Sequence, residues 1–280
     1  MSGDAARIAA VALAEDGETD VTTAVTVPAD LQAEGVIEYR SGGVLAGAAY
    51  ADAVVRACDC GVEWRAADGR TLRPGAVVGL VRGSLGRILR AERPMLNLLQ
   101  RASGIATTTR AYVDAVAGTG CRILHTRKTA PGLRALDIAA VLAGGGARHR
   151  ADLSHEVMVK DNHWRALVRG GGTLPAALEA ARARGVSALQ VEVESPGQLD
   201  EACAAGATRL LVDNQTPETV ALWGERARDL RPGIEIEATG GITLANVRAY
   251  AEAGADFVSV GALTHSVRAA DLAIEVRVLG

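Results

Sequence analysis

The fold is decided by residues 188–240, which read ALQVEVESPGQLDEACAAGATRLLVDNQTPETVALWGERARDLRPGIEIEATG. Three short apolar runs predict strands at Ala188–Val193, Arg209–Val212 and Ile234–Glu237. Between them, apolar residues recur at spacings of three and four, which is typical of helices at Gly197–Ala205 and Pro217–Leu230. Strands that alternate with helices pair in parallel through right-handed crossovers, so this stretch predicts a parallel sheet.

The same alternation continues on both sides of this stretch. Further strands are expected at Arg122–Leu124, Glu156–Val159 and Phe257–Val260, and further helices at Pro131–Ala143, Leu174–Arg184 and Leu244–Ala253. Strand and helix units that repeat in series favour an incomplete parallel α/β barrel of about six strands. An open doubly wound sheet is the alternative.

The first hundred residues predict an N-terminal α+β, sandwich-like domain. The expected elements are helices at Ala5–Ala14 and Ala49–Cys58 and strands at Val36–Tyr39, Gly43–Ala46, Val62–Ala66 and Ala76–Val81. A helix over Ser84–Arg101, interrupted at Pro94, and a second helix over Ile105–Val116 follow. We expect domains at 1–103 and 104–266, with the tail 267–280 returning to the first domain.

Composition excludes several classes of protein. A chain of 280 residues with 49% hydrophobic content and a net charge of −3 is neither disordered nor basic enough to suggest nucleic-acid binding. No apolar run reaches the roughly 18 residues of a membrane span, and no signal peptide is visible, so we expect a cytoplasmic protein. The four cysteines have neither zinc nor disulfide spacing and are expected to be reduced core thiols: Cys58, Cys60, Cys121 and Cys203.

Lysine is rare in this chain. Of 30 basic residues only Lys128 and Lys160 are lysines, and the others are arginines. A compact ammonium and a planar guanidinium are not interchangeable in a fitted site, although chance alone can leave two lysines. Both lysines follow predicted strands, so we interpret them as functional.

Polar residues gather where the predicted parallel strands end, and these ends converge on one face of a barrel. They are Thr126, Arg127, Lys128, Lys160, Glu192, Asp213 and Thr239, joined by His149 and Arg150 from a glycine-rich loop, and the last two strands are followed by the turns Gly240-Gly241 and Gly261-Ala262. Of Glu192 and Glu194, we expect one to point into the barrel and the other outward.

This mixture of groups suits a polyanionic substrate that arrives with a divalent metal. Arginine pairs with carboxylate or phosphate in a bidentate manner, and carboxylate oxygens such as those of Glu192 and Asp213 suit Mg²⁺. The glycine turns let backbone N–H groups approach a phosphate, with a helix expected to follow. The sequence therefore predicts a ligand that carries phosphate and further negative charge.

These motifs closely resemble the quinolinate phosphoribosyltransferase family over almost the whole chain. The matching runs, in order, are Asp20-Val21-Thr22-Thr23, Glu92-Arg93, Ser103–Thr107, Thr126–Thr129, Gly144–Gly146, His149-Arg150, Lys160–His163, Val191–Glu194, Asp213-Asn214, Gly240–Ile242 and Ser259–Ser266. The resemblance implies phosphoribosyl transfer from phosphoribosyl pyrophosphate to quinolinate with decarboxylation, giving nicotinate mononucleotide, pyrophosphate and CO₂ for NAD biosynthesis.

The resemblance also implies an assembly and residue roles. A homodimer or higher homo-oligomer is expected, in which Arg93 reaches into the partner's active site. Arg127, His149, Arg150 and Lys160 would hold the quinolinate carboxylates, and Lys128 would serve the pyrophosphate. Glu192 and Asp213 would hold ribose hydroxyls and Mg²⁺, with Lys128, Lys160, Glu192 and Asp213 as the catalytic groups. The remaining substrate contacts would be Thr126, Thr239, Gly240, Gly241, Val260, Gly261 and Ala262.

Several positions depart from the usual family pattern and keep alternatives open. The departures are His125, Leu142, Ala147-Arg148, Ala151–Val159 and Gln190, some of which lean toward a pyrophosphorylase homologue associated with molybdenum transport. A relative that acts on another acidic heterocycle, or a non-catalytic protein that binds phosphoribosyl ligands, is the alternative to the quinolinate enzyme.

Overall fold

The computed structural model describes residues 3–279 and divides into two compact units. The first unit contains the chain up to Arg110, Lys128–Gly146 and the chain from Ala262 onward. The second unit contains Ala111–Arg127 and Ala147–Gly261. Each unit has its own sheet and is described by itself.

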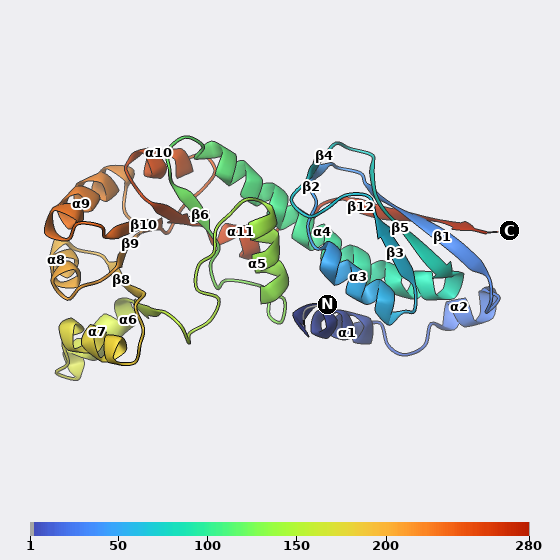
Figure 1. The fold of residues 1–280 in the computed structure, drawn as a ribbon, viewed down its shortest axis with the longest axis horizontal. Helices are drawn as coiled ribbons and strands as arrows, with labels where there is room; N and C mark the ends of the chain where they lie inside the picture. Colours follow the sequence, from blue (N-terminus) through green and yellow to red (C-terminus); the bar gives the residue numbers. More distant parts are fainter. Residues whose placement is uncertain (1–2, 280) are drawn as a thin grey trace. The chain divides into compact units, whose positions relative to one another are not determined.

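A six-stranded parallel sheet forms the second unit, with strand order β6-β11-β10-β9-β8-β7. Strands β6, β8, β9 and β10 are labelled in Figure 1. The strands are β6 (Arg122–Leu124), β7 (Val157–Val159), β8 (Leu189–Val193), β9 (Arg209–Asp213), β10 (Glu235–Thr239) and β11 (Phe257–Ser259). Every residue of β8 is buried, as expected for a parallel strand covered on both faces. The predicted incomplete barrel of six strands is confirmed, with β6 and β7 at the two ends of the order.

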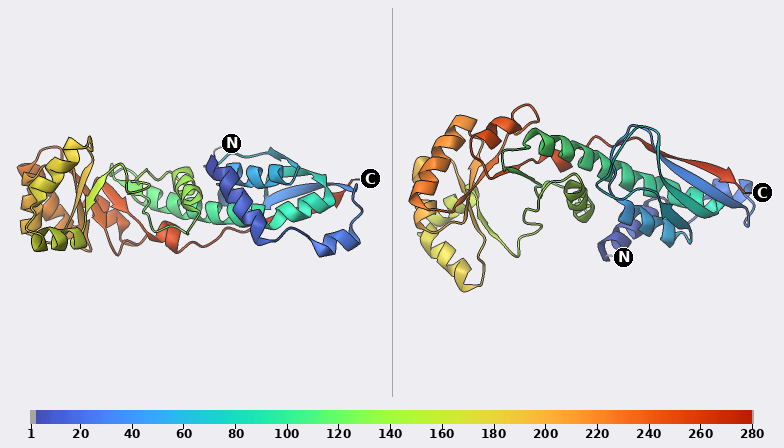
Figure 2. Two further views of the ribbon diagram at one scale, coloured as in Figure 1. Left: turned by 90° about the horizontal axis from the view of Figure 1, so that it is seen from below. Right: turned by 45° about the horizontal axis from the view of Figure 1, so that its top comes forward.

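Helices lie in an arc outside these strands (Figure 2). They are α6 (Asp161–Arg169), α7 (Leu174–Ala183), α8 (Pro196–Ala204), α9 (Pro217–Leu230) and α10 (Val247–Glu252). The Thr173, Ser195 and Thr216 side chains each accept a hydrogen bond from a backbone N–H at the start of α7, α8 and α9. A proline in the first turn fixes φ near its helical value, so nearby residues of the sequence determine where these helices begin.

Helix α6 was not predicted, because the residues after β7 were expected to form a loop. Only Trp164 of this helix is buried, and its 9 residues are fewer than the roughly 11 over which apolar periodicity is assessed. Its start is stabilised by His163, whose Nδ1 accepts a hydrogen bond from the Lys160 backbone N–H at 2.9 Å.

The first unit is built on a four-stranded antiparallel sheet with order β12-β1-β5-β3. These strands are β1 (Gln32–Tyr39), β3 (Gly61–Trp64), β5 (Ala76–Ser84) and β12 (Leu272–Val278), and a second small sheet pairs β2 (Gly43–Val44) with β4 (Thr71–Leu72). Its helices are α1 (Gly3–Glu15), α2 (Val21–Thr26), α3 (Ala48–Ala57), α5 (Arg134–Ala143) and α11 (Ala262–His265), and α4 (Leu85–Ala115) belongs to it up to Arg110. Strand β12 pairs along its own full length with β1, from Val278 opposite Ala33 to Leu272 opposite Tyr39.

Helix α4 is one continuous helix of 31 residues with Pro94 inside it. The predicted interruption at Pro94 was therefore wrong. Proline lacks the N–H that would bond to the carbonyl four residues earlier, which costs about 3 kcal/mol. Met95, Leu98 and Leu99 are buried directly after the proline, and their packing outweighs that cost.

The cysteines of the described chain are free and buried, which confirms the expectation of core thiols. Burial raises the pKa of Cys121 to about 12. Within residues 3–279, no helix combines the length and the apolar character needed to cross a membrane.

A buried ion pair in the first unit gives a stability prediction. The Asp137 side chain is fully buried and accepts hydrogen bonds from Arg101 Nε and Nη2, both at 2.8 Å, and from the Ala130 N–H at 3.2 Å. Asp137→Ala leaves a largely buried guanidinium without its partner, so the free energy of unfolding should fall by about 3 kcal/mol. Urea unfolding measures this fall, and Glu252→Ala, which breaks the exposed pair with Arg248, should cost no more than about 0.5 kcal/mol. Equal losses in the two variants would contradict the prediction.

Candidate active site

Three carboxylates meet at the carboxyl ends of β8 and β9. Oxygen atoms of Glu192, Glu194 and Asp213 all lie within 4.8 Å of one another. The expectation that Glu192 and Glu194 point in opposite directions was wrong, because residues two apart on a strand share a face. Glu192 is buried and Glu194 is exposed, so the cluster reaches from the interior to the surface.

The charges in this cluster repel one another. Burial and then the negative charge of Glu192 raise the pKa of Asp213 above its usual range, and a hydrogen bond from Asn214 and the charge of Lys160 only partly oppose this. Hard carboxylate oxygens at this separation fit a divalent cation such as Mg²⁺, which would relieve the repulsion. The donor set therefore suits the metal that the sequence analysis predicted.

Lys160 lies directly beside the cluster. Its Nζ donates a short hydrogen bond to Glu192 Oε2, and the Trp164 Nε1–H donates to the Glu192 backbone carbonyl at 2.9 Å. Lys160, just before α6, and Trp164 within α6 thus hold Glu192 at the end of β8 through its side chain and its backbone. The Lys160 side chain is 42% exposed, so its ammonium remains open to a ligand.

A second group of cations lies beside the end of β6. The chain at Ala147 runs parallel to β6, with its N–H donating to the Ile123 carbonyl at 2.7 Å, and this pairing carries Arg150 towards Arg127. Burial and then the positive charge of Arg127 lower the pKa of Arg150. Arg127 Nε is buried without a hydrogen-bond partner. Two close guanidinium groups with a buried free donor form an anion site.

Glu156 and Gln190 connect the two groups. Gln190 Nε2 donates to Glu156 Oε2 at 2.5 Å, and Glu156 lies close enough to Arg150 to raise its pKa. Gln190 shares a strand face with Glu192, which stands two residues farther along β8. Its Oε1 is buried without a partner. Glu156 and Gln190 therefore link the cations to the carboxylates along one face of the parallel sheet.

Glycine turns follow the next two strands. Gly240 and Gly241, after β10, have φ angles of 82° and 62°, and a Cβ at Gly240 would collide with the Asn214 side chain. Helix α10 begins only at Val247, later than predicted, so the turn offers its own N–H groups rather than the end of that helix. Val260 and Gly261 follow β11 at the same edge of the sheet.

Comparison with known proteins identifies the family. Family models described as the N-terminal and C-terminal domains of quinolinate phosphoribosyl transferase match residues 20–103 and 105–275. This chain belongs to the quinolinate phosphoribosyltransferase family. It is 42% identical to the nicotinate-nucleotide pyrophosphorylase [carboxylating] of Mycobacterium leprae over 266 residues, covering 91% of this chain and 90% of the relative.

Further members of the quinolinate phosphoribosyltransferase family also match this chain. A probable nicotinate-nucleotide pyrophosphorylase [carboxylating] of Bacillus subtilis is 39% identical, with 94% of this chain and 90% of the relative covered. The solved nicotinate-nucleotide pyrophosphorylase of Francisella tularensis is 31% identical and superposes with a TM-score of 0.89 over 98% of this chain and 96% of that one. Sequence and fold therefore match members of this family over nearly their whole length.

Three residues that the family resemblance singled out belong to the first unit. Arg93 lies on α4 with its side chain 60% exposed, and its ion pair with Glu92 is long, at 3.9 Å. Lys128 is exposed, and its backbone carbonyl accepts a hydrogen bond from Thr264 Oγ1 at 2.9 Å. Ala262 begins α11.

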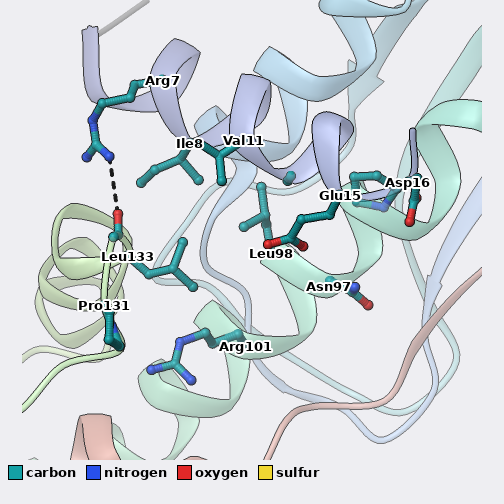
Figure 3. A pocket seen from close by; sticks show the side chains of 13 residues that line it. Arg7, Ile8, Val11, Glu15, Asp16, Asn97, Leu98, Arg101, Pro131 and Leu133 are labelled. Carbon is teal, nitrogen blue, oxygen red and sulfur yellow. Dashed lines mark hydrogen bonds between the residues drawn. The ribbon is translucent and has the colours of Figure 1, made fainter. Parts of the chain in front are cut away.

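The first unit also holds a cavity of about 320 Å³ between α1, α4 and the segment after Ala130 (Figure 3). Arg7 donates to the Gly132 carbonyl there and pairs with Asp4, and Arg101 is held by Asp137. Because both cations are already paired, the cavity lacks the unpaired donor that marks the anion site at Arg127.

Sequence reasoning did not assign a site role to several polar residues that lie at the candidate site. They are Glu156, Gln190, Glu194, Glu237 and Ser259, all on or beside the strands of the parallel sheet. The available signal was an acidic or amide side chain within an otherwise apolar strand, as at Gln190 and Glu237, since such groups are rarely buried without a purpose.

Proposed function

We propose that this chain catalyses phosphoribosyl transfer from phosphoribosyl pyrophosphate to the ring nitrogen of quinolinate, followed by decarboxylation. The products are nicotinate mononucleotide, pyrophosphate and CO₂, which makes the chain a pentosyltransferase of NAD biosynthesis. The observation that carries the proposal is that two arginines, one with a buried Nε that lacks a hydrogen-bond partner, and a cluster of three carboxylates line one end of the sheet. Membership of the quinolinate phosphoribosyltransferase family supports the choice of substrates.

The acceptor carboxylates are proposed to bind the cations. Arg127 and Arg150 offer planar donors for the 3-carboxylate, and Lys160 offers a compact charge near the 2-carboxylate. Arg93 of the partner subunit would complete this pocket. We expect the departing 2-carboxylate to be held less firmly than the 3-carboxylate, because tight pairing would oppose its loss.

The phosphoribosyl donor is proposed to bind the acidic and glycine-rich strand ends. Glu192 and Asp213 would accept hydrogen bonds from ribose hydroxyls and hold Mg²⁺, with Glu194 as an additional oxygen donor. The 5-phosphate would bind the turns Thr239–Gly241 and Val260–Ala262, with Thr126 as a further contact. Lys128 would pair with the pyrophosphate.

The reaction requires positioning more than proton transfer. The bond from the anomeric carbon to pyrophosphate breaks while the bond to the pyridine nitrogen forms, and Lys128 stabilises the departing charge. Bound Mg²⁺ would neutralise pyrophosphate charge. When CO₂ leaves, its bonding electron pair stays on the adjacent ring carbon, where the positive charge of the quaternised nitrogen stabilises the carbanion until this carbon takes up a proton.

The proposal includes a homodimer with shared active sites. Residues 1–103, with the tail 267–280 packed on them, would complete the partner's site, and residues 104–266 would form the catalytic barrel. Four free, buried cysteines support a reducing compartment such as the cytoplasm.

The test incubates the purified protein with phosphoribosyl pyrophosphate, Mg²⁺ and either quinolinate or nicotinate. Formation of nicotinate mononucleotide and CO₂ from quinolinate supports the proposal. Turnover of nicotinate alone would instead favour a relative that uses another acidic heterocycle. The observation that supports this alternative is Glu156 beside Arg150, because the Glu156 carboxylate lowers the positive charge of the pocket. Binding of both substrates without turnover would indicate a non-catalytic protein.

A mixing experiment tests the shared site. Arg93→Ala and Lys160→Ala should each be almost inactive as a pure oligomer. After dissociation and reassociation in equal amounts, mixed dimers would contain one site with both residues intact, so activity should return to roughly a quarter of the wild-type value. The measurement is the rate of CO₂ release before and after mixing. No recovery, with mixed dimers shown by mass spectrometry, would contradict a shared site.

A further inference from the structure

The His149 ring is fixed by hydrogen bonds at both nitrogens. Nδ1 accepts from the Arg150 backbone N–H at 2.6 Å, so the ring proton belongs on Nε2, which lies 3.3 Å from Glu237 Oε1. Only 6% of the His149 side chain is exposed. In this arrangement neither ring nitrogen is left for a ligand.

Glu237 anchors that ring from the interior of the sheet. Its side chain is 1% exposed and accepts hydrogen bonds from His149, from Ser259 Oγ and from Arg209 Nη1, the last at 3.2 Å. Burial raises the pKa of Glu237, but its interactions with His149, Ser259 and Arg209 more than offset this rise, so the net shift of the pKa is downward. The carboxylate is therefore ionised at neutral pH and joins three neighbouring strands.

His125 extends the network to the end of β6. Its Nε2 accepts from the His149 backbone N–H at 3.1 Å, and its Nδ1 lies 3.3 Å from the Thr126 carbonyl. Burial, opposed in part by these hydrogen bonds, lowers the pKa of His125, so the ring is neutral and donates from Nδ1. The two imidazoles thus tie the backbone before Arg127 to the backbone before Arg150.

We infer that Glu237 is a positioning residue which acts through His149 and His125 on the two guanidinium groups of the anion site. His149 holds the Arg150 backbone rather than a substrate carboxylate, although the family resemblance assigned it to the substrate. The inference rests on the proposed function for the identity of the substrate. Its physical basis is that a bound anion must be held within about 0.5 Å of the productive geometry, which mobile loops cannot do unaided.

A purely structural role for Glu237 is the competing explanation, because Glu237 also pairs with Arg209. The chain offers a matched control in Glu235, which accepts from Arg209 Nε at 2.9 Å and Nη2 at 2.8 Å. Glu235 is the residue in β10 opposite Arg209, and its side chain is 44% exposed. Both Glu→Gln changes remove a charge that pairs with Arg209, but only Glu237→Gln removes the charge that faces His149.

The experiment measures steady-state kinetics of the wild type, Glu237→Gln and Glu235→Gln with each substrate varied. Glu237→Gln should lower kcat/KM for quinolinate roughly 10- to 100-fold, mainly through KM, and change KM for phosphoribosyl pyrophosphate less than about two-fold. Glu235→Gln should leave both values within about two-fold. Equal effects in the two variants, or equal rises in both KM values, would overturn the inference.

A double-mutant cycle tests the role of His149. His149→Asn keeps an acceptor for the Arg150 N–H but cannot reach Glu237. If the two residues act through one contact, the double variant Glu237→Gln/His149→Asn should be no worse than the more impaired single variant. Multiplicative losses would mean that His149 contacts substrate independently and would overturn its assignment.

Nitrogen NMR of the ring, without substrate, tests the network directly. The wild type should show His149 as the neutral tautomer protonated at Nε2, and Glu237→Gln should shift that signal while leaving those of exposed His155 and His265 unchanged. A charged His149, or one protonated at Nδ1, would overturn the inference. Absence of quinolinate turnover in the wild type would instead overturn the proposed function, and the NMR result would still decide the network.

Discussion

Lys160→Arg is expected to lower kcat/KM for quinolinate by about a thousand-fold, with little change in the thermal unfolding midpoint. The Lys160 ammonium contacts Glu192 at the end of β8, beside the carboxylate cluster. A guanidinium is larger and planar, so it cannot occupy the same position between Glu192 and a substrate carboxylate. Because 42% of this side chain is exposed, its packing contributes little to stability.

The matched control is the reverse exchange at an exposed position. Arg148→Lys exchanges a guanidinium for an ammonium on a side chain that we expect to be solvated. The activity of this variant should therefore stay within about two-fold of the wild type. Steady-state assays and thermal unfolding of both variants provide the comparison. A Lys160→Arg enzyme with turnover within three-fold of the wild type would show that this position does not require lysine.

Asp213→Asn is expected to lower the activity by about a hundred-fold or more and to raise the thermal unfolding midpoint. Its carboxylate lies in the repelling cluster, where burial and the charge of Glu192 raise its pKa. Ionisation of Asp213 therefore opposes folding. The stabilisation that protonated Asp213 provides is complete below the ordinary pKa of about 3.8 and is lost as the pH rises through the higher folded-state value. The gain from Asn should thus be absent in acid and full at neutral pH.

Thermal unfolding across pH, in the presence of a chelator, measures this gain. Asp200→Asn is the control of opposite sign, because a hydrogen bond from Arg226 lowers the pKa of Asp200, and its loss should not stabilise the protein. Added Mg²⁺ should raise the midpoint of the wild type more than that of Asp213→Asn. Stabilisation of both variants to the same extent would contradict the role of charge repulsion.

The parallel sheet could be predicted because its signals are local. Thr216-Pro217 marks the start of α9 by capping and by the fixed proline angle, and the apolar run before it ends at Val212. The continuous helix α4 could not be predicted in the same way. Whether Pro94 ends a helix depends on the packing of Met95 and Leu98, which is a tertiary property.

Of the candidate active site, only the residues whose place follows from the strand topology could be predicted. Residues at parallel strand ends, such as Lys160, Glu192 and Asp213, follow from strand order, because those ends share one edge. The contact between His149 and Glu237 depends on the pairing of Ala147 with Ile123 and on side-chain rotamers. Neither has a signature in one sequence, so a buried glutamate within β10 gave no reason to connect it with a distant histidine.

The pairing of β12 with β1 has a consequence for synthesis on the ribosome. Strand β1 ends at Tyr39, but β12, which covers one of its edges, begins only at Leu272 and is therefore translated much later than β1. Until then the nascent sheet exposes a row of unpaired N–H and C=O groups, a template on which other chains can add. Chaperone binding during translation, or premature termination before Leu272, should therefore affect the folding of the antiparallel sheet of the first unit.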